Sequence, residues 1–303
     1  MKILVVGSIA FDTIETPYGK ADKALGGSAL YFSSSASYFS PINIVGVIGE
    51  DFHIEELDFL KERKVDMDGI MVEKGKTFFW HGKYHIDMNN RDTLVTELNV
   101  FQNFRPIIPE KYQDSPYVFL ANIDPQLQLQ ILDQVKKPKL VVLDTMNFWI
   151  SGKLDSLKEV LKRSDIAILN ESEARQISQD YNLIKAAKFI INSGPKIVII
   201  KKGEHGAILV GHNFYFYAPA YPIELVYDPT GAGDSFAGGF LGYLAKVDKL
   251  SVENLKRAMI YGSVLASFNV EKFSIERFKT LTMEEIIDRF KEFKNLTNFD
   301  YQD

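Results

Sequence analysis

Short runs of branched apolar residues recur along the chain and alternate with longer amphipathic stretches. The runs contain few polar residues and occupy positions 3–6, 42–47, 117–120, 140–143, 166–169 and 197–200. Apolar runs of this length are typical of strands that are buried on both faces, as in parallel sheets. The pattern therefore predicts an α/β domain with a mainly parallel central sheet.

The stretches between these runs show the period of amphipathic helices. Leu154, Leu157, Val160 and Leu161 recur at helical spacing, which predicts a helix over residues 154–161. Near the C-terminus, Thr282 and Glu285 have the spacing of a capping box, and an apolar stripe follows at Ile286, Ile287, Phe290 and Phe293. Because crossovers between parallel strands are right-handed, we expect helices on both faces of the sheet, in three layers.

Two segments do not fit this alternation. They cover about residues 12–25 and 69–100, and the second contains an aromatic run between Thr77 and His85. We expect antiparallel hairpins that form a small β-sheet lid projecting from the main domain. Such an aromatic sheet is suited to closing over a substrate or to forming a homodimer. The alternative is an ordinary edge extension of the main sheet.

The composition fits a single large domain over residues 1–303, with the lid segments inserted in it. A net charge of -5 and a pI near 5.7 argue against nucleic acid as a main partner. The chain has no cysteine, which excludes thiol catalysis and fits a reducing cytoplasm. No apolar run reaches the roughly 20 residues that a membrane helix needs, so we expect a soluble, cytoplasmic protein without a membrane partner.

The strongest chemical signal is the string Asp228-Pro-Thr-Gly-Ala-Gly-Asp-Ser-Phe-Ala-Gly-Gly-Phe240. We expect a strand over residues 224–227 that turns sharply into a helix starting near Asp234. Gly231 and Gly233 allow close backbone approach, and the free N–H groups of a helix start attract negative charge. Asp234 is then placed to accept a proton from an attacking hydroxyl group. The alternative is a tight turn in which Asp234 only caps the helix.

This string resembles the C-terminal signature of the PfkB carbohydrate kinase family, which includes ribokinase, fructokinases and adenosine kinase. The resemblance implies a ribokinase-like three-layer fold and transfer of the γ-phosphoryl group of ATP to a hydroxymethyl group of a sugar or sugar-like substrate. It also implies that Asp234 is the catalytic base. The backbone of Gly231, Ala232 and Gly233 would be the anion hole.

The resemblance extends to the N-terminal part of the chain. Gly26-Gly27-Ser28 resembles the family's di-glycine motif, where the backbone approaches the substrate, and Asp12 matches its substrate-binding aspartate. From the residues alone, Ser28 would be read as a helix cap and Asp12 as a turn residue. Tyr31 stands where many sugar kinases of the family have asparagine, so the identity of the substrate stays open.

Further matches concern ATP and its metal. Asn170 and Glu173 resemble the family's Asn-x-x-Glu motif, in which the glutamate orients Mg2+ through water and the asparagine helps to hold phosphate. The same spacing fits a capping box equally well, and both readings can be true. Lys201-Lys202-Gly203-Glu204-His205-Gly206 matches the glycine turn beneath the nucleotide. The resemblance thus assigns the nucleotide to Asn170, Lys202, Gly203, Gly206, Thr230 and Gly262.

The family also uses the first aspartate of the signature to bind a monovalent cation. Asp228 is present, but Phe273 follows Lys272 where glycine is usual. Activation by K+ therefore stays open.

Other signatures are weaker. Gly75-Lys76-Thr77 lacks the first glycine of a Walker A loop, and Phe236 replaces the third glycine of a dinucleotide fingerprint. His81 and His85 would share a strand face, but the sequence offers no third metal ligand.

Two rival functions remain on the same fold. A nucleoside kinase would use lid aromatics such as Phe78, Phe79, Trp80 and Tyr84 to stack on a base. A non-catalytic, ligand-binding regulatory protein would have no need of both a base and a metal-orienting glutamate. Turnover of ATP over a panel of sugars and nucleosides would separate these functions.

Overall fold

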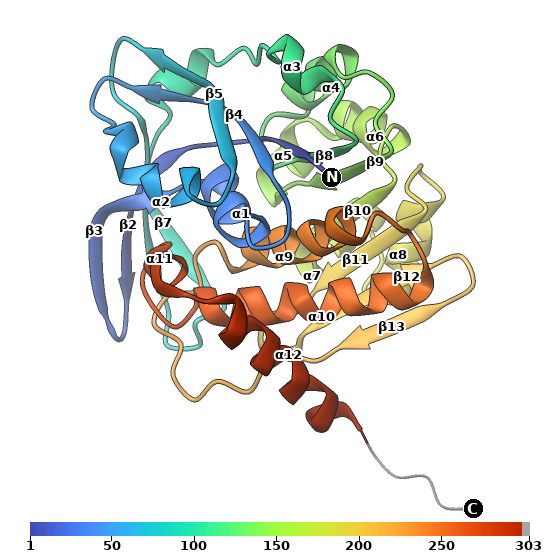
Figure 1. The fold of residues 1–303 in the computed structure, drawn as a ribbon. Helices are drawn as coiled ribbons and strands as arrows, with labels where there is room; N and C mark the ends of the chain where they lie inside the picture. The colour runs from blue at the N-terminus through green and yellow to red at the C-terminus, as the bar shows by residue number, and fades with distance from the viewer. Residues whose placement is uncertain (299–303) are drawn as a thin grey trace, which may run out of the picture.

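A computed structural model describes residues 1–298, and its centre is a large, mostly parallel sheet (Figure 1). The strand order is β13-β12-β11-β10-β9-β8-β1-β4-β5, and β12 and β13 are antiparallel to their neighbours. The strands are β1 (Ile3–Val6), β4 (Ile42–Gly49), β5 (Val65–Glu73), β8 (Tyr117–Leu120), β9 (Leu140–Asp144), β10 (Ile166–Asn170), β11 (Ile197–Lys201), β12 (Ala207–Gly211) and β13 (Tyr215–Ala218). All six strands expected from the apolar runs are confirmed.

Helices cover both faces of this sheet, as expected, because each central strand sends alternate side chains into two separate cores. Ile3 and Val5 belong to one core, and Leu4 and Val6 belong to the other. The first core is closed by α1 (Ser28–Ala36), α2 (Asp58–Lys61), α9 (Ala232–Val247), α10 (Val252–Asn269), α11 (Glu276–Thr280) and α12 (Met283–Thr297). The second is closed by α3 (Glu110–Gln113), α4 (Pro125–Gln134), α5 (Asn147–Gly152), α6 (Leu154–Lys162), α7 (Glu171–Ser178) and α8 (Leu183–Ile191).

The lid is a separate four-stranded sheet with the order β3-β2-β6-β7, visible beside the main domain in Figure 1. Its strands are β2 (Ala10–Thr16), β3 (Gly19–Gly26), β6 (Phe78–Tyr84) and β7 (Arg91–Glu97). The expected start of the second lid segment at residue 69 was wrong. Residues 69–73 continue β5, which pairs with β4 at the edge of the main sheet and buries Val65 and Met67. The edge-extension alternative therefore holds for these residues alone.

The strand expected over residues 224–227 was also wrong, since the chain is irregular between β13 and α9. Pro219 and Pro222 interrupt the segment, and Leu225 and Tyr227 are each 37% exposed. The Tyr227 N–H donates to the Val270 carbonyl, 2.8 Å away, and not to a neighbouring strand. The segment therefore has no neighbouring strand to pair with.

The C-terminal helix begins as the sequence indicated. Thr282 and Glu285 form the expected capping box at the start of α12, and Ile286 and Phe293 are buried. Within residues 1–298, no helix combines the length and the apolar character that crossing a bilayer requires.

Candidate active site

The start of α9 carries the predicted base. The N-cap is Gly231 and the helix begins at Ala232, two residues earlier than expected, so Asp234 lies inside its first turn. The Asp234 Oδ1 atom is buried and has no hydrogen-bond partner within the described residues. No side chain caps this helix, so Asp234 is not its cap. Burial and the nearby Asp144 carboxylate raise the pKa of Asp234 to about 8, while Lys201 opposes the shift. A carboxylate with a pKa near neutrality is suited to general-base catalysis.

The backbone conformation and the close packing at position 231 both require glycine. Its φ of 74° lies in the left-handed region, and a Cβ atom there would lie 2.1 Å from the Tyr31 ring. The ring of Tyr31 thus packs directly against the backbone of the predicted anion hole, and its hydroxyl group is buried without a partner in residues 1–298. Burial, with Asp12 and Asp228 nearby, raises the pKa of Tyr31 well above its usual range. Tyr31 is therefore a neutral, unpaired donor within the site.

Asp12 lies near the same residues, since its carboxylate helps to raise the pKa of both Asp234 and Tyr31. It is buried on β2, and a Cβ atom at Gly26 would lie 2.0 Å from its Oδ2 atom. Burial and the Asp228 carboxylate raise the pKa of Asp12 to about 8, against a hydrogen bond from the Gly27 backbone. Gly26 therefore leaves space for the buried carboxylate of Asp12.

Ser28 is not the cap of α1, because Gly27 holds that position and no side chain caps the helix. Its hydroxyl instead pairs with Ser8: the Ser8 N–H donates to Ser28 Oγ at 3.2 Å, and the Ser28 N–H donates to Ser8 Oγ at 3.0 Å. These bonds fix the start of α1 against the segment that follows β1.

Asp228 at the other end of the motif is fully buried and fully engaged. Its Oδ1 accepts from the Thr230 N–H and its Oδ2 from the Ser274 N–H, both at 2.8 Å. The Thr230 hydroxyl in turn donates to the Tyr84 hydroxyl of the lid at 3.1 Å, and Asn269 Nδ2 donates to the Thr230 carbonyl. Burial raises the pKa of Asp228 to about 6, although these backbone bonds lower it. Its role as a ligand of a monovalent cation stays a prediction.

Asn170 and Glu173 form the expected capping box at the start of α7. Glu173 is buried and accepts from the Asn170 N–H at 2.7 Å and from Asn170 Nδ2 at 2.6 Å. Burial raises the pKa of Glu173 to about 7, with Lys201 lowering it and Asp144 raising it. The structural reading of this motif is thus confirmed, and the metal-orienting role stays a prediction.

The glycine turn after β11 has the backbone that its sequence suggested. Gly203 and Gly206 have φ values of 54° and 82°, and the Lys202 N–H donates to the Gly206 carbonyl at 2.7 Å. A Cβ atom at Gly203 would lie 2.7 Å from Oδ1 of Asn89, in the loop between β6 and β7. The tip of the lid therefore lies on this turn.

Gly262 is the predicted site residue that these contacts do not reach. It lies within α10, where a Cβ atom would be 2.9 Å from the Phe236 ring of α9. This close approach explains the glycine by helix packing, and its part in nucleotide binding stays a prediction.

Two charged residues beside Asp234, Lys201 and Asp144, were not among the predicted site residues. Lys201 ends β11 and Asp144 ends β9, and the Lys201 Nζ lies 3.5 Å from Asp144 Oδ1, with side-chain exposures of 18% and 6%. The available signal was a polar residue directly after each buried apolar run, because the carboxyl ends of parallel strands share one edge of the sheet.

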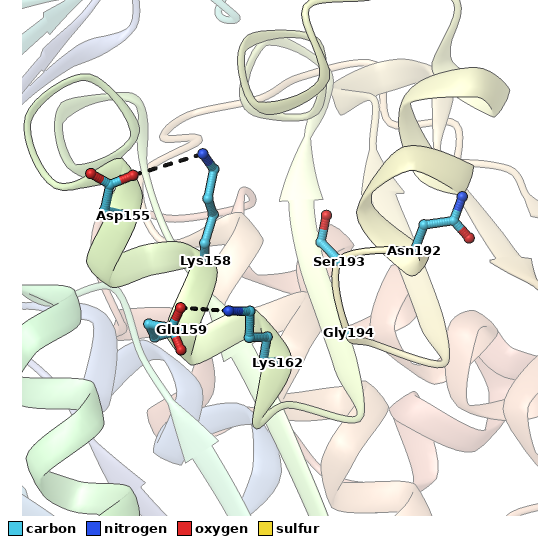
Figure 2. Close-up of a pocket in the computed structure, with 7 residues that line it drawn as sticks. All are labelled: Asp155, Lys158, Glu159, Lys162, Asn192, Ser193 and Gly194. Carbon is cyan, nitrogen blue, oxygen red and sulfur yellow. Dashed lines mark hydrogen bonds and ion pairs between the residues drawn. The ribbon is translucent and has the colours of Figure 1, made fainter.

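Other polar features lie elsewhere. His81 and His85 pair with Glu15 and Asp92, and no group of three ligating side chains able to hold a metal occurs among the described residues. Figure 2 shows a surface hollow beside α6, lined by Asp155, Lys158, Glu159, Lys162, Asn192, Ser193 and Gly194. This hollow adjoins the loop that precedes β11, at the opposite end of that strand from Lys201, and contains none of the predicted site residues.

Comparisons with known proteins show the family and the fold. The family model described as pfkB family carbohydrate kinase matches residues 2–278. The cytidine kinase of Thermococcus kodakarensis is 34% identical over 250 residues, which cover 80% of this chain and 88% of that protein. The nucleoside kinase structure from Methanocaldococcus jannaschii has a TM-score of 0.76 and 20% identity, covering 96% of this chain and 98% of that one. A putative ribokinase II from E. coli, in complex with ATP and Mg2+, has a TM-score of 0.77 and 21% identity over 96% and 99% of the two chains.

The ribokinase-like fold and the glycine-aspartate helix start define a small-molecule kinase. The chain belongs to the pfkB family of carbohydrate kinases. It is a phosphotransferase, as the sequence analysis expected.

Proposed function

We propose that this kinase phosphorylates a nucleoside, transferring the γ-phosphoryl group of ATP to the hydroxymethyl group of the ribose. Asp234 is the base in this proposal, and the backbone of Gly231, Ala232 and Gly233 is the anion hole. The family allows both sugars and nucleosides, so the argument depends on the residues that would contact the acceptor.

The observation that carries the proposal is the register between β2 and β6. Asp12 pairs with Trp80, and Ile14 pairs with Gly82, so the side chains of Asp12, Ile14 and Trp80 share one face of the lid. Gly82 leaves room for the indole, since a Cβ atom there would lie 2.1 Å from the Trp80 ring. On the opposite face, His81 pairs with Glu15. The face that carries Asp12, the carboxylate proposed to bind the substrate, thus also carries a large aromatic ring.

This pair of side chains suits a nucleoside better than a free sugar. A buried carboxylate such as Asp12 can accept hydrogen bonds from ribose hydroxyl groups, and an indole can stack on a base. Base stacking on an aromatic side chain contributes about 1–3 kcal/mol. The similarity to the T. kodakarensis cytidine kinase supports the same conclusion.

The reaction follows from the positions of the charged groups. The acceptor oxygen attacks the γ-phosphorus, the bond from phosphorus to the bridging oxygen of ADP breaks, and the hydroxyl proton passes to Asp234. Fixed N–H donors at the start of α9 stabilise the charge of the phosphoryl oxygens. Tyr84 and Asn89 connect the lid to the Thr230 loop and to the Gly203 turn, which supports a lid that shields the transfer from water.

The residues present fit a Mg2+ ion that arrives with ATP. Glu173 is a buried carboxylate that uses one lone pair on each oxygen for Asn170, which leaves acceptor capacity for a metal-bound water. The ion would neutralise phosphate charge. We expect Glu173→Gln to lower the apparent Mg2+ affinity about tenfold, as substitution of an outer-shell ligand typically does. The nucleoside KM should stay nearly unchanged. An unchanged Mg2+ titration would count against this role.

The test of the proposed function is ATP turnover over cytidine, uridine, adenosine, ribose and inositol, with the product identified. We expect a nucleoside 5′-monophosphate. Trp80→Ala should raise the nucleoside KM about 5- to 150-fold, whereas Phe79→Ala, its neighbour on the opposite face, should not. Ribose as the preferred acceptor, with equal effects of the two substitutions, would favour the sugar kinase.

A further inference from the structure

Lys201 places a positive charge directly behind the anion hole. It is the last residue of β11, and its Nζ lies 2.8 Å from the position of a Cβ atom at Gly233. Any side chain at position 233 would therefore displace the ammonium group. The glycine thus lets the ammonium lie beside the start of α9, whose N–H groups are proposed to receive the phosphoryl charge.

The ammonium is only partly satisfied by the protein. Within residues 1–298 its one ion-pair partner is Asp144, at 3.5 Å, although an ammonium carries three donors. Burial lowers the pKa of Lys201, but the carboxylates of Asp144, Glu173 and Asp234 together raise it above its usual value. Lys201 is therefore charged at neutral pH, and its ammonium has N–H donors that are free to bind a ligand.

A purely structural role does not account for this arrangement. Asp144 ends β9 and Lys201 ends β11, and β10 lies between them, so the pair spans a whole strand. A buried ion pair of this kind gains little stability over apolar packing. The Lys201–Asp144 pair lies beside Gly233 and Asp234, where a positive charge would act on the transferred phosphoryl group.

We propose that Lys201 is a further catalytic residue, whose ammonium contacts an oxygen of the γ-phosphoryl group during transfer. Asp144 is the positioning residue that holds the ammonium toward Gly233. This inference rests on the kinase activity, but not on the choice of acceptor.

Lys201 takes no part in the proton balance. The acceptor oxygen forms a bond to phosphorus as the bond to the ADP oxygen breaks, and the electron pair leaves with ADP. Asp234 receives the hydroxyl proton. Lys201 stays protonated and stabilises negative charge on the equatorial oxygens, as fixed cations do in other phosphoryl transfers.

The test compares Lys201→Met with Lys196→Met, a control that removes an exposed lysine just before the same strand. We expect Lys201→Met to lower kcat about 100- to 1,000-fold. It should weaken binding of a non-hydrolysable ATP analogue about 10- to 100-fold and leave ADP affinity within about twofold. Lys196→Met should match the wild type in all three.

A second readout is the pH profile of kcat/KM. Asp234 is faced by Lys201, Asp144, Glu173 and Asp12, and Lys201 alone lowers its pKa. Lys201→Met should therefore move the acidic limb of the profile to higher pH, which a merely structural change would not do.

Lys201→Met leaves the Asp144 carboxylate buried without its partner, which can destabilise the fold. The double variant Lys201→Met/Asp144→Asn removes this uncompensated charge and is tested beside the single variant. A folded single or double variant with kcat within about threefold of wild type would overturn the proposal. Equal losses of ATP-analogue and ADP affinity would also overturn it. Wild-type turnover is measured in parallel on cytidine: failure there contradicts the proposed acceptor, whereas the nucleotide-binding comparison still tests Lys201.

Discussion

Asp228 and Asp234, the two aspartates of the signature, are six positions apart, yet their carboxylates differ in their hydrogen bonds. Asp228 is fully buried, and each of its oxygens accepts a backbone N–H at 2.8 Å. Asp234 has a buried oxygen with no partner in the described residues. Leaving a buried carboxylate unsatisfied costs folding free energy, so a protein retains one where a ligand or a reaction needs it.

The comparison shows that burial does not by itself separate structural from reactive carboxylates. Burial raises the pKa of both, to about 6 for Asp228 and about 8 for Asp234. The difference lies in the hydrogen bonds. Asp228 joins the Thr230 loop to Ser274, whereas Asp234 faces the site among Asp12, Asp144, Glu173 and Lys201.

Removing the carboxylate of Asp228 should therefore damage stability. Asp228→Ala leaves the Thr230 and Ser274 amides without acceptors, and each unsatisfied buried amide costs about 1–3 kcal/mol. We expect a loss of about 2–6 kcal/mol in the free energy of unfolding, measured by urea denaturation. Asp155→Ala, at a fully exposed carboxylate, is the control. A loss of activity at unchanged stability would assign Asp228 to the chemistry instead.

The unpaired state of Asp234 should appear in the pH dependence of stability. Its pKa is higher in the folded protein than in the unfolded chain, so the folded state binds the proton more tightly. Stability should then fall as the pH rises from about 4 to about 8, and Asp12, with a pKa of about 8, acts in the same direction. Asp234→Asn should reduce this fall by up to about 6 kcal/mol, since each pKa unit corresponds to about 1.4 kcal/mol. Identical pH profiles for variant and wild type would refute the assignment.

The lid contact with the Asp228 loop should contribute less. Tyr84→Phe removes one hydrogen bond to Thr230, which is typically worth about 0.5–1.5 kcal/mol. We expect a small loss of stability and a modest rise in nucleoside KM, with kcat nearly unchanged. Tyr217→Phe, on the exposed side of β13, should change neither. An effect on kcat larger than that on KM would show that Tyr84 does more than hold the lid.

Much of the fold could be predicted because its central strands are continuous apolar runs, which few other structures accommodate. The strand predicted over residues 224–227 was wrong, because a strand needs a neighbouring strand to pair with and this segment has none. The position of Asp234 near the start of a helix and the glycine turn after β11 could be predicted from local sequence, whereas the role of Asp234 as base stays a prediction. The Lys201–Asp144 pair and the packing of Tyr31 on Gly231 could not, because each joins elements whose proximity depends on the topology of the whole sheet.

The most direct test of the difference between the two aspartates is the single-turnover rate of Asp234→Asn, measured where chemistry limits the reaction. Asparagine keeps the shape of the side chain but cannot accept the hydroxyl proton. If Asp234 is the base, the rate should fall roughly 100-fold or more, because general-base catalysis contributes about 10²–10⁴-fold. ATP affinity should be unchanged, and the variant should be at least as stable as wild type. A folded variant that retains more than about a tenth of the wild-type rate would contradict the catalytic role of Asp234.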